Sequence, residues 1–211
     1  MNRKLLLFSV PAVLLGAGAA YLGAPAADAG GGRARLDFVP GAMSVAITGQ
    51  GRDAANYYLS YTLKNPMDEA RTPRLHIEVR TETKKTYADH PDAKVVAAAA
   101  KDLKAADLKS TADLRSAGLA AGASVQAVAN FGNIDPNADD ITVRVYGLWD
   151  PVVRTRQGKV YSEKRVLVLQ FARFGDEYDR PMDPITMTSK KEEVEGDVTE
   201  LYTTTAEKKT K

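Results

Sequence analysis

Apolar and polar residues alternate along much of the chain, and this period of two is typical of strands that bury one face. In the segment RLHIEVR, Leu75, Ile77 and Val79 are apolar, while the residues between them are charged or carry an imidazole. The alternation predicts a strand here. The same pattern predicts further strands at 43–47, 57–63, 124–131 and 141–147.

The segment RVLVLQF (165–171) is apolar at consecutive positions, which is typical of a central strand covered on both faces. Turn-forming residues, such as NPMDE at 65–69, separate the strand patterns. Short strands joined by turns predict an all-β fold, an antiparallel β-sandwich of about seven strands.

One segment between two predicted strands has a different composition, because residues 90–110 are rich in Ala, Lys, Leu and Asp. Pro91 and Asp92 are typical of a helix N-terminus. We therefore expect one inserted helix at Ala93–Ala106 that packs on the sandwich. Its apolar stripe consists of Val95, Val96, Ala99, Ala100 and Leu103.

The first residues have the pattern of an export signal, with Arg3 and Lys4 followed by an uncharged apolar run. Ala27 and Ala29 satisfy the small-x-small rule for cleavage, so residues 1–29 are predicted to be a signal peptide. Cleavage after Ala26 is an alternative. An uncleaved anchor is another, since roughly 20 apolar residues span a bilayer. Pro11 and the Gly- and Ala-rich second half favour removal. We expect an exported protein, periplasmic or extracellular.

Residues 30–35 are a predicted linker, and residues 36–186 are predicted to form the sandwich. Residues 187–211 are charged and rich in Thr, with few large apolar side chains. That composition predicts a disordered polar tail. A short amphipathic helix or a partner-binding tail is the alternative for this segment.

The composition limits the partners that the chain can attract. Because the chain has no cysteine, it has neither disulfides nor a lipid-modified cysteine. Its 29 Lys and Arg are nearly balanced by 27 Asp and Glu. A near-neutral chain has no strong field to attract nucleic acid or an anionic membrane. We expect a protein partner, and membrane contact only if the N-terminal segment is uncleaved.

A family resemblance rests on five motifs, in the order YYLSYTLKN, HIEVRTETKKTYAD, LAAGASVQAVANF, DDITVRVYGL and EKRVLVLQFARFGDEYD. Their order resembles exported bacterial immunoglobulin-like domains of unknown function, of the FxLYD and telokin-like kinds, over residues 42–180. Those domains have a strand ending in Asn and a Leu-x-Pro-Gly turn, where this chain has LAAG at 119–122. The resemblance implies an immunoglobulin-like sandwich and an exported location, and it provides no catalytic residues.

The segment FGNIDPNADD (131–140) has oxygen-bearing side chains at the spacing of a calcium loop. Counted from Asp135, it lacks the glycine at position 6 and the glutamate at position 12 that the helix–loop–helix motif requires. A bend between two strands is the simpler interpretation. The alternative function is a calcium-binding module made of loops 135–140 and 176–183, although we expect that the two loops do not meet. Its candidate ligands are Asp135, Asp139, Asp140, Asp176 and Asp179.

Motifs for catalysis are missing from the sequence. The chain has two histidines, His76 and His90, and no Gly-x-Ser-x-Gly segment or glycine-rich phosphate loop that follows a strand. We therefore predict no enzyme activity and no cofactor.

The segment from Trp149 to Lys164 is longer than a tight turn requires, and RQGK (156–159) is predicted to be the tip of a hairpin. Trp, Tyr and Arg are enriched where protein partners dock. The alternative is that Trp149 folds back and caps the sandwich. We expect a non-catalytic binding or structural module of the cell envelope or periplasm, which uses this hairpin or a sheet edge. The predicted partner-binding residues are Trp149, Arg154, Arg156 and Tyr161.

Overall fold

The computed structural model describes residues 35–197, except 51–53, 151, 157–158 and 175–184. These residues form ten strands and two helices. In chain order they are β1 (Asp37–Ile47), β2 (Ala55–Lys64), β3 (His76–Thr81), β4 (Thr86–Ala88), α1 (Ala93–Leu103), β5 (Lys109–Ser110), α2 (Thr111–Ala117), β6 (Ser124–Asn130), β7 (Asp140–Tyr146), β8 (Val152–Arg156), β9 (Lys159–Arg173) and β10 (Ile185–Asp197).

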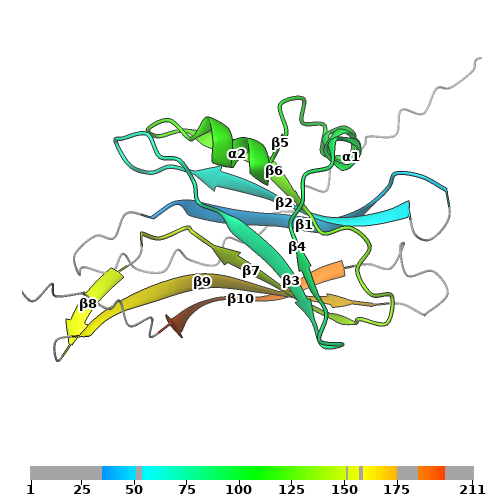
Figure 1. Cartoon of the computed structure of the whole chain (residues 1–211). Coiled ribbons are helices and arrows are strands. Elements are labelled where there is room, and N and C mark those ends of the chain that lie inside the picture. Colours follow the sequence, from blue (N-terminus) through cyan, green and yellow to red (C-terminus); the bar gives the residue numbers. More distant parts are fainter. Residues whose placement is uncertain (1–34, 51–53, 151, 157–158, 175–184, 198–211) are drawn as a thin grey trace, which may run out of the picture. The chain divides into compact units, whose positions relative to one another are not determined.

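The strands form two sheets that lie face to face (Figure 1). The smaller sheet has the order β1-β2-β6-β5, and the larger has the order β10-β9-β7-β3-β4, with β8 paired to β9. Every pairing is antiparallel except the short one between β5 and β6. The predicted all-β sandwich is confirmed, with more strands than the seven expected.

The core between the sheets is built from the positions that the alternation marks as apolar. Leu75, Ile77 and Val79 are buried in it, and the side chains of His76 and Arg80 point to solvent. β9 is buried on both faces between Val166 and Leu169, as its unbroken apolar run predicts. Burial of such side chains is the main source of stability for a sandwich without disulfides.

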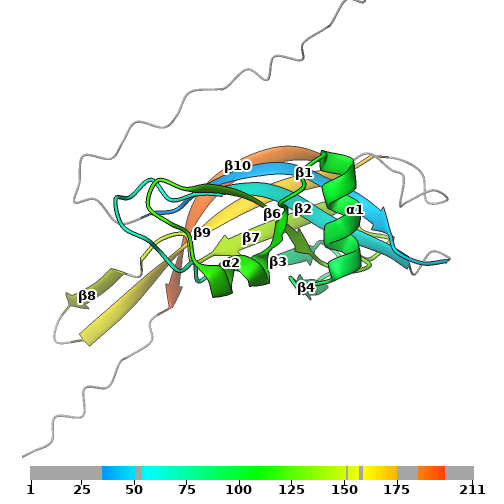
Figure 2. The same cartoon turned by 90° about the horizontal axis from the view of Figure 1, so that it is seen from above.

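The smaller sheet is covered on its second face by α1, as Figures 1 and 2 show. Tyr58 and Val128 of the sheet pack against Val95 and Ala99 of the helix. The Asp92 side chain accepts a hydrogen bond from the Lys94 amide and so caps the helix N-terminus. The predicted helix is therefore confirmed in place and in packing.

The helix is shorter than predicted, because Lys104 takes a left-handed conformation (φ 53°) and ends it. Leu103, the last residue of the helix and one expected in the apolar stripe, is 42% exposed. The second helix, α2, was not predicted. Its N-terminus is a capping box, in which Ser110 and Asp113 bond each other's backbone amides.

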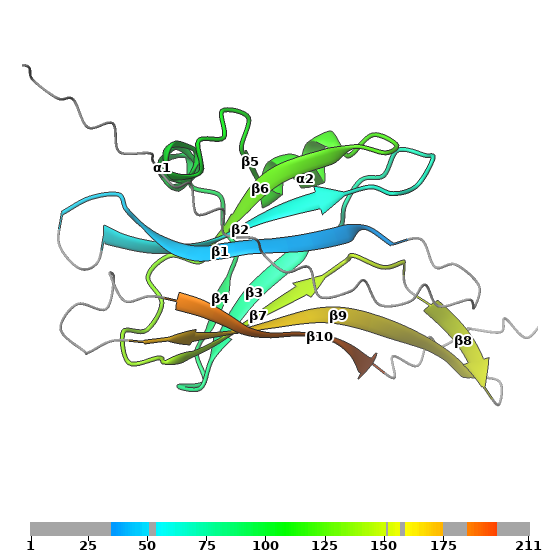
Figure 3. The same ribbon diagram turned by 180° about the vertical axis from the view of Figure 1, so that it is seen from behind.

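The predicted disordered tail is wrong for residues 187–197, which belong to β10, and the sandwich therefore does not end at residue 186. β10 pairs with β9 from Ile185 opposite Arg173 to Asp197 opposite Ser162. Figure 3 shows β10 at the edge of the larger sheet, beside β1. A strand at an edge needs few apolar side chains, since backbone hydrogen bonds and ion pairs hold it.

Ion pairs hold β10 from both of its faces. Arg144 of β7 bonds to Glu193 and Glu195 on the outer face. On the other face, Glu192 pairs with Arg35 at 3.1 Å, and the Lys190 ammonium donates to the Phe38 carbonyl oxygen. The charged residues of this segment, whose composition predicts a tail, include the groups that attach the strand to its neighbours, namely Lys190, Glu192, Glu193 and Glu195.

The N-terminal predictions, the signal peptide at 1–29 and the linker at 30–35, lie outside the described residues apart from residue 35. Among the helices that the structure describes, none has the length and apolar character to cross a membrane.

Candidate functional site

The segment FGNIDPNADD forms a bend between β6 and β7. Hydrogen bonds and an ion pair join this bend to the β3–β4 hairpin. Asp135 is 6% exposed, and its carboxylate accepts hydrogen bonds from the Thr83 hydroxyl and the Asn137 amide. The Lys85 ammonium lies 2.8 Å from the same carboxylate. The hydrogen bond from Lys85, followed by that from the Asn137 amide, lowers the pKa of Asp135 to about 2.

The next acidic residues of the bend are also engaged through their backbone. The amides of Asp139 and Asp140 donate to the two carboxylate oxygens of Glu82, at 2.5 and 3.1 Å. The Asp139 carbonyl oxygen accepts from the amide of Arg173. These bonds support the interpretation of a structural bend.

In the part of the chain that the structure describes, no group of three or more His, Asp or Glu residues is placed so that it could hold a metal ion. The described residues therefore provide no ligand set for calcium. Asp176 and Asp179, the candidate ligands of the second acidic loop, lie outside the described residues. The expectation that the two loops do not meet stays a prediction.

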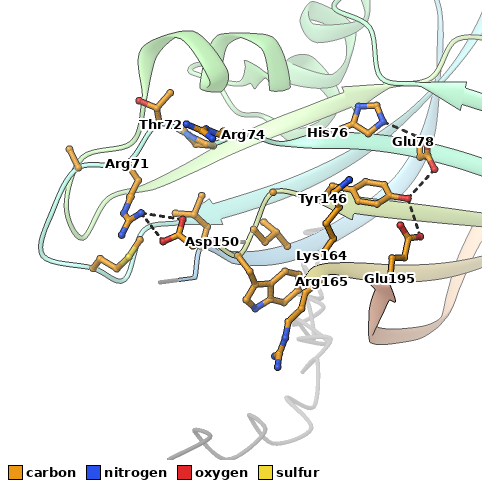
Figure 4. A pocket seen from close by; sticks show the side chains of 17 residues that line it. Arg71, Thr72, Arg74, His76, Glu78, Tyr146, Asp150, Lys164, Arg165 and Glu195 are labelled. Atoms are coloured by element: carbon orange, nitrogen blue, oxygen red, sulfur yellow. Dashed lines mark hydrogen bonds and ion pairs between the residues drawn. The ribbon is translucent and has the colours of Figure 1, made fainter. Parts of the chain in front are cut away.

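A cavity of about 840 Å³ lies where the ends of several strands converge (Figure 4). Its walls come from the connection between β2 and β3, the segment that follows β7, and β9 and β10. The volume falls in the range of roughly 300–1,000 Å³ that is typical of ligand sites. It is lined by Leu36, Met67, Ala70, Arg71, Thr72, Pro73, Arg74, His76, Glu78, Tyr146, Gly147, Leu148, Trp149, Asp150, Lys164, Arg165 and Glu195.

Trp149 contributes an aromatic surface to this cavity. The residue is partly buried and packs against the core, while the Arg35 guanidinium lies 5.4 Å from the centre of its ring. Trp149 thus folds back onto the sandwich and also lines the cavity. Its role in partner binding stays a prediction. The floor beside it is apolar, because Leu36, Pro73 and Leu148 are buried there.

Gly147 brings the two sides of the cavity together. It follows β7 with φ 81°, and a Cβ at this position would lie 2.1 Å from the carbonyl oxygen of Arg74. Only a residue without a side chain permits this contact. The contact fixes the distance between the segment that carries Arg74 and the segment that carries Trp149.

Arginine side chains form part of the rim. Arg71 bonds to Asp150 at 3.0 Å and to Glu69 at 2.8 Å. Arg74 is exposed, and among the described residues its guanidinium has no ion-pair partner. Arg165 lies at 4.0 Å from Glu192. Of these three arginines, Arg74 is therefore the one whose charge no described acidic group pairs.

The acidic residues of the cavity take part in a network on the outer face of the larger sheet. The Tyr146 hydroxyl accepts from Arg144 Nε, and its single hydrogen can be donated to Glu78 at 3.3 Å or to Glu195 at 3.4 Å (Figure 4). Glu78 also bonds to Arg80 at 2.7 Å, and burial raises the pKa of Tyr146. These acids are bound to arginines or to tyrosine, and the network joins β3, β7 and β10.

Of the predicted partner-binding residues, only Trp149 has a described side chain, and it lies in the cavity. Arg154 and Tyr161 are paired opposite each other in the backbone of the β8–β9 hairpin, which confirms the predicted hairpin. The side chains of Arg154, Arg156 and Tyr161 lie outside the described residues.

Sequence reasoning missed Arg71, Arg74 and Gly147. The first two lie in the segment ARTPR (70–74), whose Pro and Arg indicate only an exposed connection. A glycine directly after a strand, as in VYG at 145–147, is a signal of close backbone approach that could have been noticed. What the glycine contacts depends on the pairing of β3 with β7.

No protein-family model, curated protein or solved structure matches this chain.

Proposed function

We propose that this chain is a non-catalytic, exported module that binds a protein partner in the cavity beside Trp149. The observation that carries the proposal is the placement of Trp149 on an apolar floor next to Arg71 and Arg74. Protein interfaces combine an apolar centre with a polar rim, and their energetically dominant residues are enriched in Trp, Tyr and Arg.

A binding role is also supported by the state of the carboxylates in the cavity. Asp150 is bound to Arg71, Glu78 to Arg80, and Glu195 to Arg144. A general acid or base needs a pKa near the working pH and access to a substrate proton. Carboxylates bound to arginine are poorly suited to that task. They are well suited to holding the walls of a binding site in place.

The fold is proposed to be of the immunoglobulin-like kind. Supporting this, β2 pairs with β6 in one sheet, and β3, β7 and β9 are neighbours in the other. Immunoglobulin sandwiches place strands B and E, and strands C, F and G, in this way. The parallel pairing of β5 and the addition of β10 depart from that pattern.

A contact between two of the resemblance motifs points the same way. Asn65, which follows β2, donates from its side chain to the carbonyl oxygens of Leu119 and Ala120. The motif that ends in Asn and the turn LAAG are therefore joined by hydrogen bonds. Such a contact gives a physical reason for the two motifs to occur together.

The proposal is tested by the effect of the cavity on partner binding. Envelope extract is passed over the immobilised chain, the retained protein is identified and purified, and its affinity is measured directly. Trp149→Ala and Arg74→Glu should each weaken binding by about tenfold or more. Phe174→Ala is the matched control, since Phe174 is an exposed aromatic residue (56%) that does not line the cavity.

Thermal melting of each variant tests whether the fold is retained. If the purified partner binds both cavity variants as tightly as it binds the unchanged chain, the proposed function is wrong. Arg74→Glu keeps the test decisive if Trp149→Ala fails to fold, because Arg74 is exposed.

A further inference from the structure

We infer that the cavity binds an extended acidic peptide, which adds as a strand to the open edge of β8 and brings a carboxylate to Arg74. The inference rests on the proposed function and specifies the chemistry of the partner. It is carried by two independent observations, which are the pairing of β8 and the distribution of charge around the cavity.

The position of β8 in the larger sheet follows from the residues with which β9 pairs on each of its two sides. Ser162 and Glu163 pair with β10 on one side and with Val153 and Val152 of β8 on the other. β8 therefore lies on the opposite side of β9 from β10, which is the side where β7 pairs with Leu167 to Ala172. β7 and β8 follow one another along the same edge of β9.

The two strands differ in what lies beyond them. β7 is covered by β3, whereas β8 pairs with β9 alone among the residues that the structure describes. Figures 1 and 2 show β8 and the adjoining part of β9 projecting beyond β3. An unpaired strand edge offers backbone donors and acceptors to an incoming peptide.

The open edge and the cavity are continuous in the chain. Trp149 and Asp150 line the cavity, and β8 begins at Val152. On the opposite wall, Arg71 to Arg74 precede β3, the strand that occupies the equivalent place beside β7. A strand added to β8 would thus extend toward the cavity floor, where its alternate side chains could contact Trp149.

Charge selects an acidic peptide. The β8–β9 segment 152–165 holds five basic residues and a single acidic one, VVRTRQGKVYSEKR. Arg74 adds a positive charge from the facing wall that no described acidic group pairs, whereas Arg71 beside it is already bound to Asp150 and Glu69. Potentials of opposite sign across an interface favour encounter and suppress wrong partners.

The last residues of this chain do not have that composition. Beyond β10, residues 198–211 read VTELYTTTAEKKTK, in which lysines outnumber glutamates. The acidic strand is therefore expected from another protein. One of the acidic side chains at alternate positions would face Arg74, and apolar side chains between them would face the apolar floor.

The test uses Trp149 as its probe, because it is the only tryptophan of the chain. The peptide acetyl-EVEVEVE-amide is titrated into the full chain while tryptophan fluorescence is recorded. We expect a saturable change, an affinity that falls with added salt, and binding weaker by about tenfold or more for the glutamine analogue QVQVQVQ. Equal binding of the lysine analogue KVKVKVK would overturn the inference.

Two further comparisons separate charge from strand pairing. Arg74→Glu should weaken binding of the acidic peptide by about tenfold or more, while Lys94→Glu, an exposed charge reversal on α1, should leave it unchanged. Methylation of alternate backbone nitrogens in the peptide removes donors and should abolish binding. Undiminished binding of the methylated peptide would overturn the addition to β8.

The outcomes also distinguish this inference from the proposed function. If the purified partner binds in a manner sensitive to Trp149→Ala but the acidic peptide does not bind, the peptide chemistry is wrong and the binding role stands. If neither Trp149→Ala nor Arg74→Glu affects the partner, the binding role itself is wrong. Self-association of the free chain that Arg74→Glu abolishes would show that a second copy occupies the site, and would overturn the inference.

Discussion

The Lys85 ammonium lies 2.8 Å from the buried carboxylate of Asp135 and joins the β3–β4 hairpin to the bend between β6 and β7. The bend has the spacing of a calcium loop, but the oxygens of its first acid are used by Lys85, Thr83 and the Asn137 amide. The segment's role is to hold two connections together at one end of the sandwich.

The substitution Asp135→Asn should destabilise the chain in a pH-dependent way. The pKa of Asp135 is lowered in the folded state from 3.8 to about 2. The carboxylate's contribution to the free energy of unfolding is therefore fully present above pH 3.8 and is lost as the pH falls through about 2. We expect Asp135→Asn to lower the free energy of unfolding by about 1–3 kcal/mol at pH 7. The loss should shrink toward pH 2, as measured by urea denaturation. A loss that is the same at pH 7 and pH 2 would contradict this role.

Calcium should leave the melting temperature unchanged, because the Asp135 carboxylate already has hydrogen-bond and ion-pair partners. A ligand that binds only the folded state must raise the midpoint of unfolding. The measurement is thermal melting with and without millimolar calcium. A rise that Asp135→Asn abolishes would show that the bend binds the ion after all.

Arg144 should matter more to stability than a typical surface arginine. Its side chain is 12% exposed and bonds to Glu193 and Glu195, which attaches β10 to β7. Arg144→Ala should lower the free energy of unfolding by about 1–3 kcal/mol. It should also speed hydrogen exchange in β10. The matched control is Arg80→Ala on β3, where an exposed ion pair contributes less than about 1 kcal/mol. Equal effects of the two changes would contradict the assignment.

Alanine substitutions at Gly122 and Gly147 separate the stability cost of backbone strain from the cost of steric overlap. Both have positive φ, but a Cβ at Gly147 would overlap the Arg74 carbonyl group, whereas nothing lies within 4 Å of one at Gly122. Gly122→Ala should cost about 1 kcal/mol of backbone strain. Gly147→Ala should cost more and should also weaken partner binding. Chemical denaturation of both variants measures the difference, and equal costs would argue against the close contact.

The strands and the first helix could be predicted because their signals are local. Leu75, Ile77 and Val79 follow the period of two that a sheet imposes, and Asp92 marks the start of α1 as an N-cap. These features depend on residues a few positions apart. The immunoglobulin-like resemblance and the exported location remain predictions.

The sequence-based predictions fail where contacts between residues far apart in the chain determine the structure. β10 has the composition of a disordered tail, yet Arg35 and Arg144 bind its glutamates from strands and segments far away in sequence. The cavity could likewise be predicted only in part. Trp149 could be selected as a candidate binding residue because of its residue type. Its position opposite Arg71 results from the pairing of β3 with β7, and no spacing in a single sequence specifies that pairing.

The proposed partner site is the surface beside Trp149. The most direct measurement is acrylamide quenching of the fluorescence of this single tryptophan, with and without the purified partner. Trp149 is partly buried in the free chain, and a bound partner should shield it, so the quenching constant is predicted to fall on saturation. A quenching constant that is unchanged when the partner is fully bound would contradict this placement of the site.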